Sequence, residues 1–248
     1  MTVVLICNII FAYSQNSPDK IEGVKKIVIE SKILNEDRVI YVYISENKNN
    51  NDLSVLYTLD GYRTDFFQKA INNLDSKQHI IIGIDTKENR TRDLSPTVIP
   101  SRSGSCGGEK FMKFLSNELI PYINKHYNTS NSNTFFGASL GGLFVIYTML
   151  TNSVLFEKYI SLSPPIGYCS DFMDDLLNTY NLSEKTTNKS LFLCFGSRQE
   201  MPQCKNYIPD FYTKLKKKLP NIEYKVYENE GHVPKSGMQD SFKFINLK

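Results

Sequence analysis

Short apolar runs alternate with stretches of helical spacing along most of this chain. Two β-rich runs come first, at residues 27–34 and 38–45, and the turn residues N-E-D between them predict an antiparallel strand pair. Further strands, separated by helical segments, are predicted at residues 55–60, 80–85, 134–138, 158–163, 190–196 and 222–228. Long helical segments between strands imply right-handed crossovers. The pattern therefore predicts an α/β fold with a mostly parallel central sheet, helices on both faces and an antiparallel N-terminal strand pair.

The predicted helices include residues 109–127, 139–150, 171–180 and 207–219. Helix 109–127 is recognised because its apolar residues recur every three or four positions and form one stripe that can be buried against a sheet. Pro121 lies inside this helix and is expected to bend it, since proline lacks a backbone N–H. The basic run 214–218 belongs to helix 207–219, so we interpret it as a solvated helix face.

The first residues, M-T-V-V-L-I-C-N-I-I-F-A-Y-S-Q, have the pattern of a secretory signal. Small residues, Ala12 and Ser14, follow the apolar run and predict cleavage after Ser14. The run is shorter than the about 20 apolar residues that span a bilayer, so no stable membrane insertion is expected. We therefore expect residues 1–14 to be a signal peptide, residues 15–248 to form a single domain, and the mature protein to be exported to the periplasm or secreted. The alternative is a first buried strand in a cytoplasmic protein.

The length of 248 residues and the 41% hydrophobic content are those of one large folded domain. A net charge of +3 with scattered basic residues argues against a nucleic-acid-binding protein. Cys7 would leave with the signal peptide, and the other four cysteines match no zinc spacing. In an exported chain these four could pair in any of three ways, although Cys194 lies in an apolar run where a buried thiol is the ordinary interpretation. Neither a metal nor another cofactor is predicted.

The clearest chemical motif is G-A-S-L-G-G at residues 137–142, between the predicted strand T-F-F and the helical run L-F-V-I-Y-T-M-L. In open α/β sheets, ligands gather where the strands end. A serine in a sharp strand-to-helix turn, with small residues two before and two after it, is typical of a nucleophile elbow. The turn also places Ser139 at a helix N-terminus, where backbone N–H groups stabilise negative charge. The motif predicts Ser139 as a catalytic nucleophile.

A serine nucleophile needs a base within hydrogen-bond reach, and imidazole has a suitable pKa. The chain has three histidines. His79 opens a predicted strand and His126 lies on a predicted helix, so both are interpreted as structural. His232, in the loop N-E-G-H-V-P after the last predicted strand, is therefore predicted as the general base.

The third member of a triad would be an acid that orients the imidazole. Glu200, in F-G-S-R-Q-E, follows the strand before that of His232 and fits the chain order of serine, acid and histidine. Asp171 and Asp210 are the competing acids, and Glu200 could instead be a surface carboxylate. Glu200 is the predicted triad acid.

Several segments together make the chain similar to a known family. V-L-Y-T-L-D-G-Y, I-I-G-I-D with N-R-T-R-D-L-S-P, F-L-S-N-E-L-I-P-Y-I, G-A-S-L-G-G-L, F-E-K-Y-I-S-L-S-P and E-G-H-V occur in the order found in the esterase D-like and enterochelin esterase-like α/β-hydrolases, the "Putative esterase" family. The resemblance covers nearly everything after residue 25 and implies the α/β-hydrolase fold. Such families include S-formylglutathione hydrolases, siderophore trilactone esterases, feruloyl and acetyl-xylan esterases, and mycolyltransferases.

The resemblance also implies an oxyanion hole, formed by the N–H of Leu140 and an N–H from the D-G-Y turn, either that of Gly61 or that of Tyr62. Asp60 and Arg92 are expected at the substrate site; the alternatives are an ordinary turn for Asp60 and a loop-stabilising ion pair for Arg92. Siderophore-type relatives carry a Trp pair after S-P, whereas this chain reads S-P-P-I-G-Y and has no Trp. Some of those relatives work with a Ser–His pair and no acid.

The sequence thus predicts a serine esterase, a carboxylic-ester hydrolase that forms an acyl-enzyme on Ser139 with His232 as general base. Its substrate is expected to be a small-molecule or glycan-linked ester. One alternative is acyl transfer to a sugar or lipid hydroxyl, because the same apparatus performs it when an alcohol replaces water. The other is a binding protein that keeps the fold without the chemistry. The oligomeric state is not encoded in a recognisable pattern.

Overall fold

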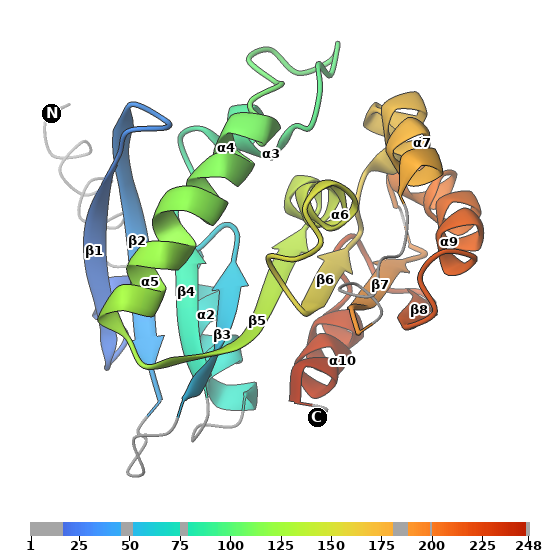
Figure 1. Ribbon diagram of the computed structural model, residues 1–248. Coiled ribbons are helices and arrows are strands. Elements are labelled where there is room, and N and C mark those ends of the chain that lie inside the picture. The colour runs from blue at the N-terminus through green and yellow to red at the C-terminus, as the bar shows by residue number, and fades with distance from the viewer. Residues whose placement is uncertain (1–16, 46–51, 75–78, 181–187, 199, 247–248) are drawn as a thin grey trace, which may run out of the picture.

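The structure is a computed structural model that describes residues 17–45, 52–74, 79–180, 188–198 and 200–246 (Figure 1). Within these residues one eight-stranded sheet runs through the protein, with helices packed on both of its faces. The predicted signal peptide, residues 1–14, lies outside the described residues.

The strands lie in the order β1-β2-β4-β3-β5-β6-β7-β8. β1 pairs with β2, and β2 with β4, in antiparallel fashion, whereas the neighbours from β4 to β8 are parallel. The mostly parallel sheet with an antiparallel N-terminal pair is therefore confirmed. The carboxyl ends of the six parallel strands share one edge, and that edge is where chemistry is expected. The strands are β1 (Val24–Ser31), β2 (Glu36–Ile44), β3 (Leu53–Thr58), β4 (His79–Ile84), β5 (Thr129–Ala138), β6 (Lys158–Leu162), β7 (Ser190–Gly196) and β8 (Ile222–Tyr227).

Two apolar cores lie on the two faces of the sheet. On one face, α2 (Thr64–Asn73) and α10 (Lys235–Asn246) meet through Phe66 and Phe242, whose ring centroids are 6.0 Å apart. On the other face, Phe144 of the central helix α6 packs against Phe111 at 5.3 Å. The helices of this second face are α3 (Arg90–Leu94), α4 (Gly108–Phe114), α5 (Ile120–His126), α6 (Leu140–Thr151), α7 (Ser170–Thr179), α8 (Pro202–Lys205) and α9 (Ile208–Lys216). Two short 3₁₀ helices complete the order: Pro18–Lys20 precedes β1, and Ile166–Tyr168 lies between β6 and α7.

The predicted helix 109–127 is present, but its centre is not α-helical. A π-helical segment, Leu115–Leu119, joins α4 to α5, and Pro121 follows it directly. Since proline cannot donate the hydrogen bond that an α-helix needs, the widened turn accommodates Pro121. Two short helices, α3 and α8, were not predicted, because segments of so few residues have no measurable periodicity.

The first strand ends at Ser31, before the predicted end at residue 34. The cause is Glu118 of the π-helical segment, which lies far away in the sequence. Its carboxylate accepts hydrogen bonds from the Ser31 hydroxyl at 2.5 Å and from the backbone N–H groups of Lys32 and Ile33 at 3.0 Å each. These N–H groups therefore serve the turn and not the ladder between β1 and β2.

In the part of the chain that the structure describes, no helix is long and apolar enough to cross a membrane. Four cysteines lie there, and each is a free thiol: Cys106 is exposed, whereas Cys169, Cys194 and Cys204 are buried. None of the three conceivable disulfide pairings is formed among them. The interpretation of Cys194 as a buried strand residue is confirmed, and burial raises the pKa of its thiol.

Candidate active site

Ser139 lies in a strained turn between β5 and α6. It is the N-cap of α6, and its backbone angles of φ 55° and ψ −125° are ones that residues with side chains rarely adopt. The Ser139 N–H donates to the carbonyl of Leu162 at the end of β6, at 2.8 Å, and its own carbonyl accepts the N–H of Leu143 at 3.0 Å. The turn is therefore held at both ends, and the side chain of Ser139 stays partly exposed at the carboxyl edge of the sheet.

The glycines around Ser139 differ in how much space they have. A Cβ on Gly137 would lie 2.3 Å from the carbonyl oxygen of Gly141, and one on Gly142 would lie 2.9 Å from the carbonyl oxygen of Leu162. Both positions need glycine because backbone atoms fill the space. A Cβ on Gly141 would make ordinary van der Waals contacts, with Leu59 at 3.5 Å and with Oδ2 of Asp60 at 3.9 Å. Backbone atoms therefore approach closely at Gly137, two residues before the serine, and at Gly142, three residues after it. The sequence motif instead places its second small residue at Gly141, two residues after the serine.

His232 lies in the loop between β8 and α10, and its ring contacts Glu200. Nδ1 of His232 is 2.7 Å from Oε1 of Glu200, and the Glu200 side chain is fully buried. Asn229 and Val233, on either side of the histidine, have φ of 61° and 57°. Positive φ is costly for a β-branched residue such as Val233, so the loop is held in a conformation that the chain would not adopt alone.

Two hydrogen bonds connect this loop to the serine turn through the end of β6. Leu162 accepts the N–H of Ser139, and the next residue, Ser163, accepts the N–H of Val233 on its hydroxyl at 3.4 Å. The backbones that carry Ser139 and His232 are therefore fixed to adjacent residues of one strand end. Both predicted residues therefore belong to turns that are bonded to the end of β6, at the carboxyl edge of the sheet.

Glu200 is held through one of its two oxygens. Oε1 accepts the backbone N–H of Met201 at 2.8 Å in addition to the contact with His232. Burial would raise the pKa of Glu200, but the hydrogen bonds from His232 and Met201 outweigh it, so that the pKa of Glu200 is lowered. Glu200 is therefore an ionised carboxylate facing an imidazole, which is the arrangement of a triad acid.

The competing acids lie elsewhere. Asp171 is exposed in the first turn of α7, where the Ser170 hydroxyl donates to it at 3.3 Å. Asp210 is exposed on α9 and pairs with Lys214 at 2.7 Å. Of the three candidate acids, Glu200 is the one that contacts His232.

The other histidines are remote from this edge. His79 is the first residue of β4, so it lies at the amino edge of the parallel strands, and it is buried. His126 is exposed at the end of α5 and stacks on Tyr122 with ring centroids 4.0 Å apart. His126 Nδ1 is also 2.8 Å from the Tyr122 carbonyl oxygen. Neither position faces the serine turn.

The D-G-Y turn follows β3 and lies against the backbone of β4. The Gly61 N–H donates to the carbonyl of Ile84 at 2.8 Å, so it is engaged within the protein and does not form part of an oxyanion hole in this structure. A Cβ on Gly61 would lie 2.2 Å from the carbonyl carbon of Gly83, which makes glycine obligatory here. In the described part of the chain the Tyr62 N–H has no backbone partner. Of the two predicted donors in this turn, Tyr62 remains the candidate.

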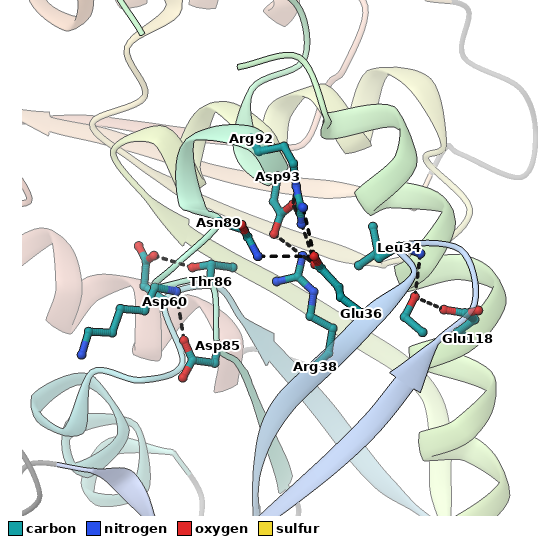
Figure 2. Close-up of polar contacts among 12 residues, drawn as sticks. Leu34, Glu36, Arg38, Asp60, Asp85, Thr86, Asn89, Arg92, Asp93 and Glu118 are labelled. Carbon is teal, nitrogen blue, oxygen red and sulfur yellow. Dashed lines mark hydrogen bonds and ion pairs between the residues drawn. The ribbon is translucent and has the colours of Figure 1, made fainter. Parts of the chain in front are cut away.

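Both carboxylate oxygens of Asp60 have partners within the protein, in an ion pair and a hydrogen bond. Nε and a terminal nitrogen of Arg90 bind its two oxygens at 2.7 and 2.8 Å. The Thr86 hydroxyl donates to Oδ1 at 2.7 Å (Figure 2). Arg90 also donates to the carbonyl of Ala138, the residue before Ser139, at 3.2 Å. Arg90 therefore ties the D-G-Y turn to the serine turn. Asp60 thus takes part in an ion pair that supports the site, and its contact with a substrate stays a prediction.

Arg92 belongs to an ion-pair network on the other side of α3. It binds Glu36 of β2 at 2.5 and 3.0 Å and Asp93 at 2.8 Å, while Arg38 bridges the same two carboxylates (Figure 2). Hydrogen bonding to Arg92 lowers the pKa of Glu36 although its partial burial opposes this. This geometry is that of the loop-stabilising ion pair considered for Arg92, and a contact of Arg92 with a substrate stays a prediction.

Cys204 of α8 lies beside the acid and the histidine. One ligand atom each of Glu200, Cys204 and His232 lies within 4.8 Å of the other two. A metal would need the thiolate, but burial raises the pKa of Cys204, and the thiol is bound to the Ser163 carbonyl at 3.3 Å. It would also have to replace the hydrogen bond between His232 and Glu200. The cluster of Glu200, Cys204 and His232 therefore does not suit a metal.

The sheet order and the serine turn define the α/β-hydrolase class of protein. The model of the "Putative esterase" family matches residues 31–244, and the chain belongs to that family. Over 135 residues it is 27% identical to the ferri-bacillibactin esterase BesA of Bacillus subtilis, covering 51% of this chain and 47% of BesA. It is 25% identical to the siderophore triacetylfusarinine C esterase of Aspergillus fumigatus, covering 52% of this chain and 46% of the relative. The chain thus matches about half the length of these curated relatives.

Solved structures show the same fold. An IroE-like serine hydrolase from Shewanella oneidensis superposes with a TM-score of 0.76 at 24% identity, covering 89% of this chain and 79% of that one. The siderophore hydrolase EstA from Aspergillus nidulans superposes with a TM-score of 0.78 at 19% identity, covering 92% of this chain and 96% of EstA. The predicted α/β-hydrolase fold and family resemblance are confirmed.

Proposed function

We propose that this chain is a serine carboxylic-ester hydrolase with Ser139 as the nucleophile and His232 as the general base. The observation that carries the proposal is the hydrogen bond between His232 and the buried, ionised Glu200, in a loop that Ser163 fixes beside the strained serine turn. The family match supports ester hydrolysis as the reaction. The strained backbone of Ser139 supports its role, because such strain concentrates at functional residues.

In the proposed reaction, Nδ1–H of His232 donates to Glu200, which leaves Nε2 as the base. Nε2 takes the proton of Ser139 while the serine oxygen attacks the ester carbonyl. The N–H groups of Leu140 and Tyr62 would stabilise the oxyanion; that of Leu140 is available because the first N–H groups of a helix have no intrahelical partner. The imidazolium then protonates the departing alcohol. A water molecule, deprotonated by the same ring, releases the acid from Ser139.

The substrate is proposed to be a small-molecule carboxylic ester. Two relatives are named as the ferri-bacillibactin esterase and the siderophore triacetylfusarinine C esterase, which makes siderophore esters the first compounds to try. This chain has no Trp, so we expect a large aromatic trilactone to be a weaker substrate than a smaller ester. Sugar acetates, feruloyl esters, a thioester and p-nitrophenyl esters of several chain lengths complete the panel.

The test is the Ser139→Ala variant assayed beside the wild type and His126→Ala. We expect Ser139→Ala to lose several orders of magnitude in kcat, about 10⁶-fold by analogy with other serine hydrolases, while its unfolding curve stays close to that of the wild type. A fluorophosphonate probe should label the wild type and His126→Ala but not Ser139→Ala. Full activity of Ser139→Ala, or labelling of another residue, would show that the nucleophile is wrongly assigned.

Product analysis with an added alcohol decides between hydrolysis and transfer. If water is the acceptor, the free acid forms at the same rate with and without alcohol. Formation of a new ester in place of the acid would identify an acyltransferase, and a chain that neither turns over an ester nor reacts with the probe would be a binding protein.

A further inference from the structure

Ser163 connects three segments of the site. It follows β6, is fully buried, and has φ of 47°, a conformation that favours glycine. Its N–H donates to the carbonyl of Cys194 in β7 at 2.7 Å, and its carbonyl accepts the thiol of Cys204 at 3.3 Å. Its hydroxyl accepts the N–H of Val233 at 3.4 Å. A serine kept at a strained backbone position, where glycine would cost less, points to a use for the hydroxyl.

The second oxygen of Glu200 is the place where that hydroxyl is needed. Oε1 takes both hydrogen bonds that the carboxylate receives, while Oε2 is buried and has no partner in the described part of the chain. An ionised oxygen buried in this way is costly unless a donor reaches it. Ser163 and Cys204 are the side chains near enough to act on the carboxylate. The single proton of the Cys204 thiol is already donated to the Ser163 carbonyl, which leaves the hydroxyl proton of Ser163.

We propose that Ser163 is a positioning residue for the reaction, whose hydroxyl accepts the N–H of Val233 and donates its proton to Oε2 of Glu200. One small side chain then holds the acid and the histidine loop against each other, so that Nε2 of His232 keeps its direction toward Ser139. Ser163 touches neither substrate nor reacting atoms, and the inference rests on the proposed function.

The experiment uses two substitutions that remove the same hydroxyl and affect the backbone differently. Ser163→Ala keeps a Cβ at φ 47°, whereas Ser163→Gly also relieves the strain, so the glycine variant should unfold at the higher urea concentration. If the hydroxyl positions Glu200, both variants should lose the same factor in kcat, about 10- to 100-fold for a lost hydrogen bond to a charged group, with KM nearly unchanged. Cys204→Ala, which removes the neighbouring thiol, is the matched control and should retain kcat.

Proton NMR supplies a readout that a merely structural role would not move. The Nδ1–H of His232, bound to Glu200, should give a resonance far downfield of the amides, and it should shift or broaden in both Ser163 variants but not in Cys204→Ala. Wild-type kcat in either Ser163 variant, or kcat values that follow the stability order with glycine above alanine, would overturn the proposal. A wild-type protein without esterase activity would overturn the proposed function instead, and the resonance would still test the contact.

Discussion

Replacing Glu200 by glutamine tests how the acid works, because the structure dictates how the amide must sit. Oε1 of Glu200 accepts the N–H groups of Met201 and His232, at 2.8 and 2.7 Å. If the amide nitrogen took this place it would face two donors, which is unfavourable. The amide oxygen is therefore expected to replace Oε1, and the amide nitrogen to replace Oε2 beside Ser163. His232 then keeps the tautomer with the proton on Nδ1.

What the Glu200→Gln variant loses is the negative charge and not the orientation of the ring. Two unit charges about 4 Å apart interact by about 4 kcal/mol at an effective dielectric constant of about 20. Each 1.36 kcal/mol in the barrier is about a factor of ten in rate. We therefore expect kcat to fall by about 10²–10³-fold. This is less than the about 10⁴-fold loss that occurs when an amide selects the wrong tautomer.

The assay is steady-state hydrolysis of a chromogenic ester, with urea unfolding to verify the fold. Asp171→Asn and Asp210→Asn are the controls; both carboxylates are exposed, and both variants should keep wild-type rates. A Glu200→Gln variant with a near-normal rate would refute the electrostatic role, and the site would then work as a Ser–His pair. A loss of about 10⁴-fold or more would refute the orientation of the amide deduced from Met201.

Three further outcomes are expected. Gly61→Ala should destabilise the protein by at least about 1–3 kcal/mol and abolish activity, because the new Cβ would lie 2.2 Å from the carbonyl carbon of Gly83. The control, Gly141→Ala, should keep or raise the urea midpoint. Asp240 has a pKa of about 2 because Lys243, Tyr227 and Lys225 bind its carboxylate. Its contribution to the free energy of unfolding is therefore present above about pH 4 and is lost as the pH falls through about 2. Wild type and Asp240→Asn should differ in urea midpoint at about pH 5 but not at about pH 2. N-terminal sequencing of the mature protein should begin at Gln15, and an intact Met1 in a cytoplasmic fraction would refute export.

Apolar periodicity was sufficient for the sheet and the long helices. The central strands are buried on both faces and read as continuous apolar runs, and helices such as residues 109–127 show one apolar stripe. Local patterns were sufficient to propose Ser139 and His232, because a strand-turn-helix around a serine and a lone loop histidine can be recognised in the sequence. The signals failed where an element is short or held by distant partners. α3 is held by the ion pairs of Arg92 with Glu36 and of Arg38 with Asp93. The early end of β1 depends on the hydrogen bonds of Glu118. In each case the partner is far away in the sequence.

The sequence by itself determined the fold class and singled out a candidate nucleophile and a candidate base, since each depends on residues that are close together in the chain. Only the tertiary structure decided which carboxylate contacts His232, because Glu200, Asp171 and Asp210 differ in burial and in neighbours, not in local pattern. The same holds for Gly61 and Tyr62: adjacent amides look equivalent in the sequence, and the carbonyl of Ile84 occupies one of them. Partner choice for a buried polar group depends on atoms that folding brings from elsewhere, and a linear pattern does not contain that geometry.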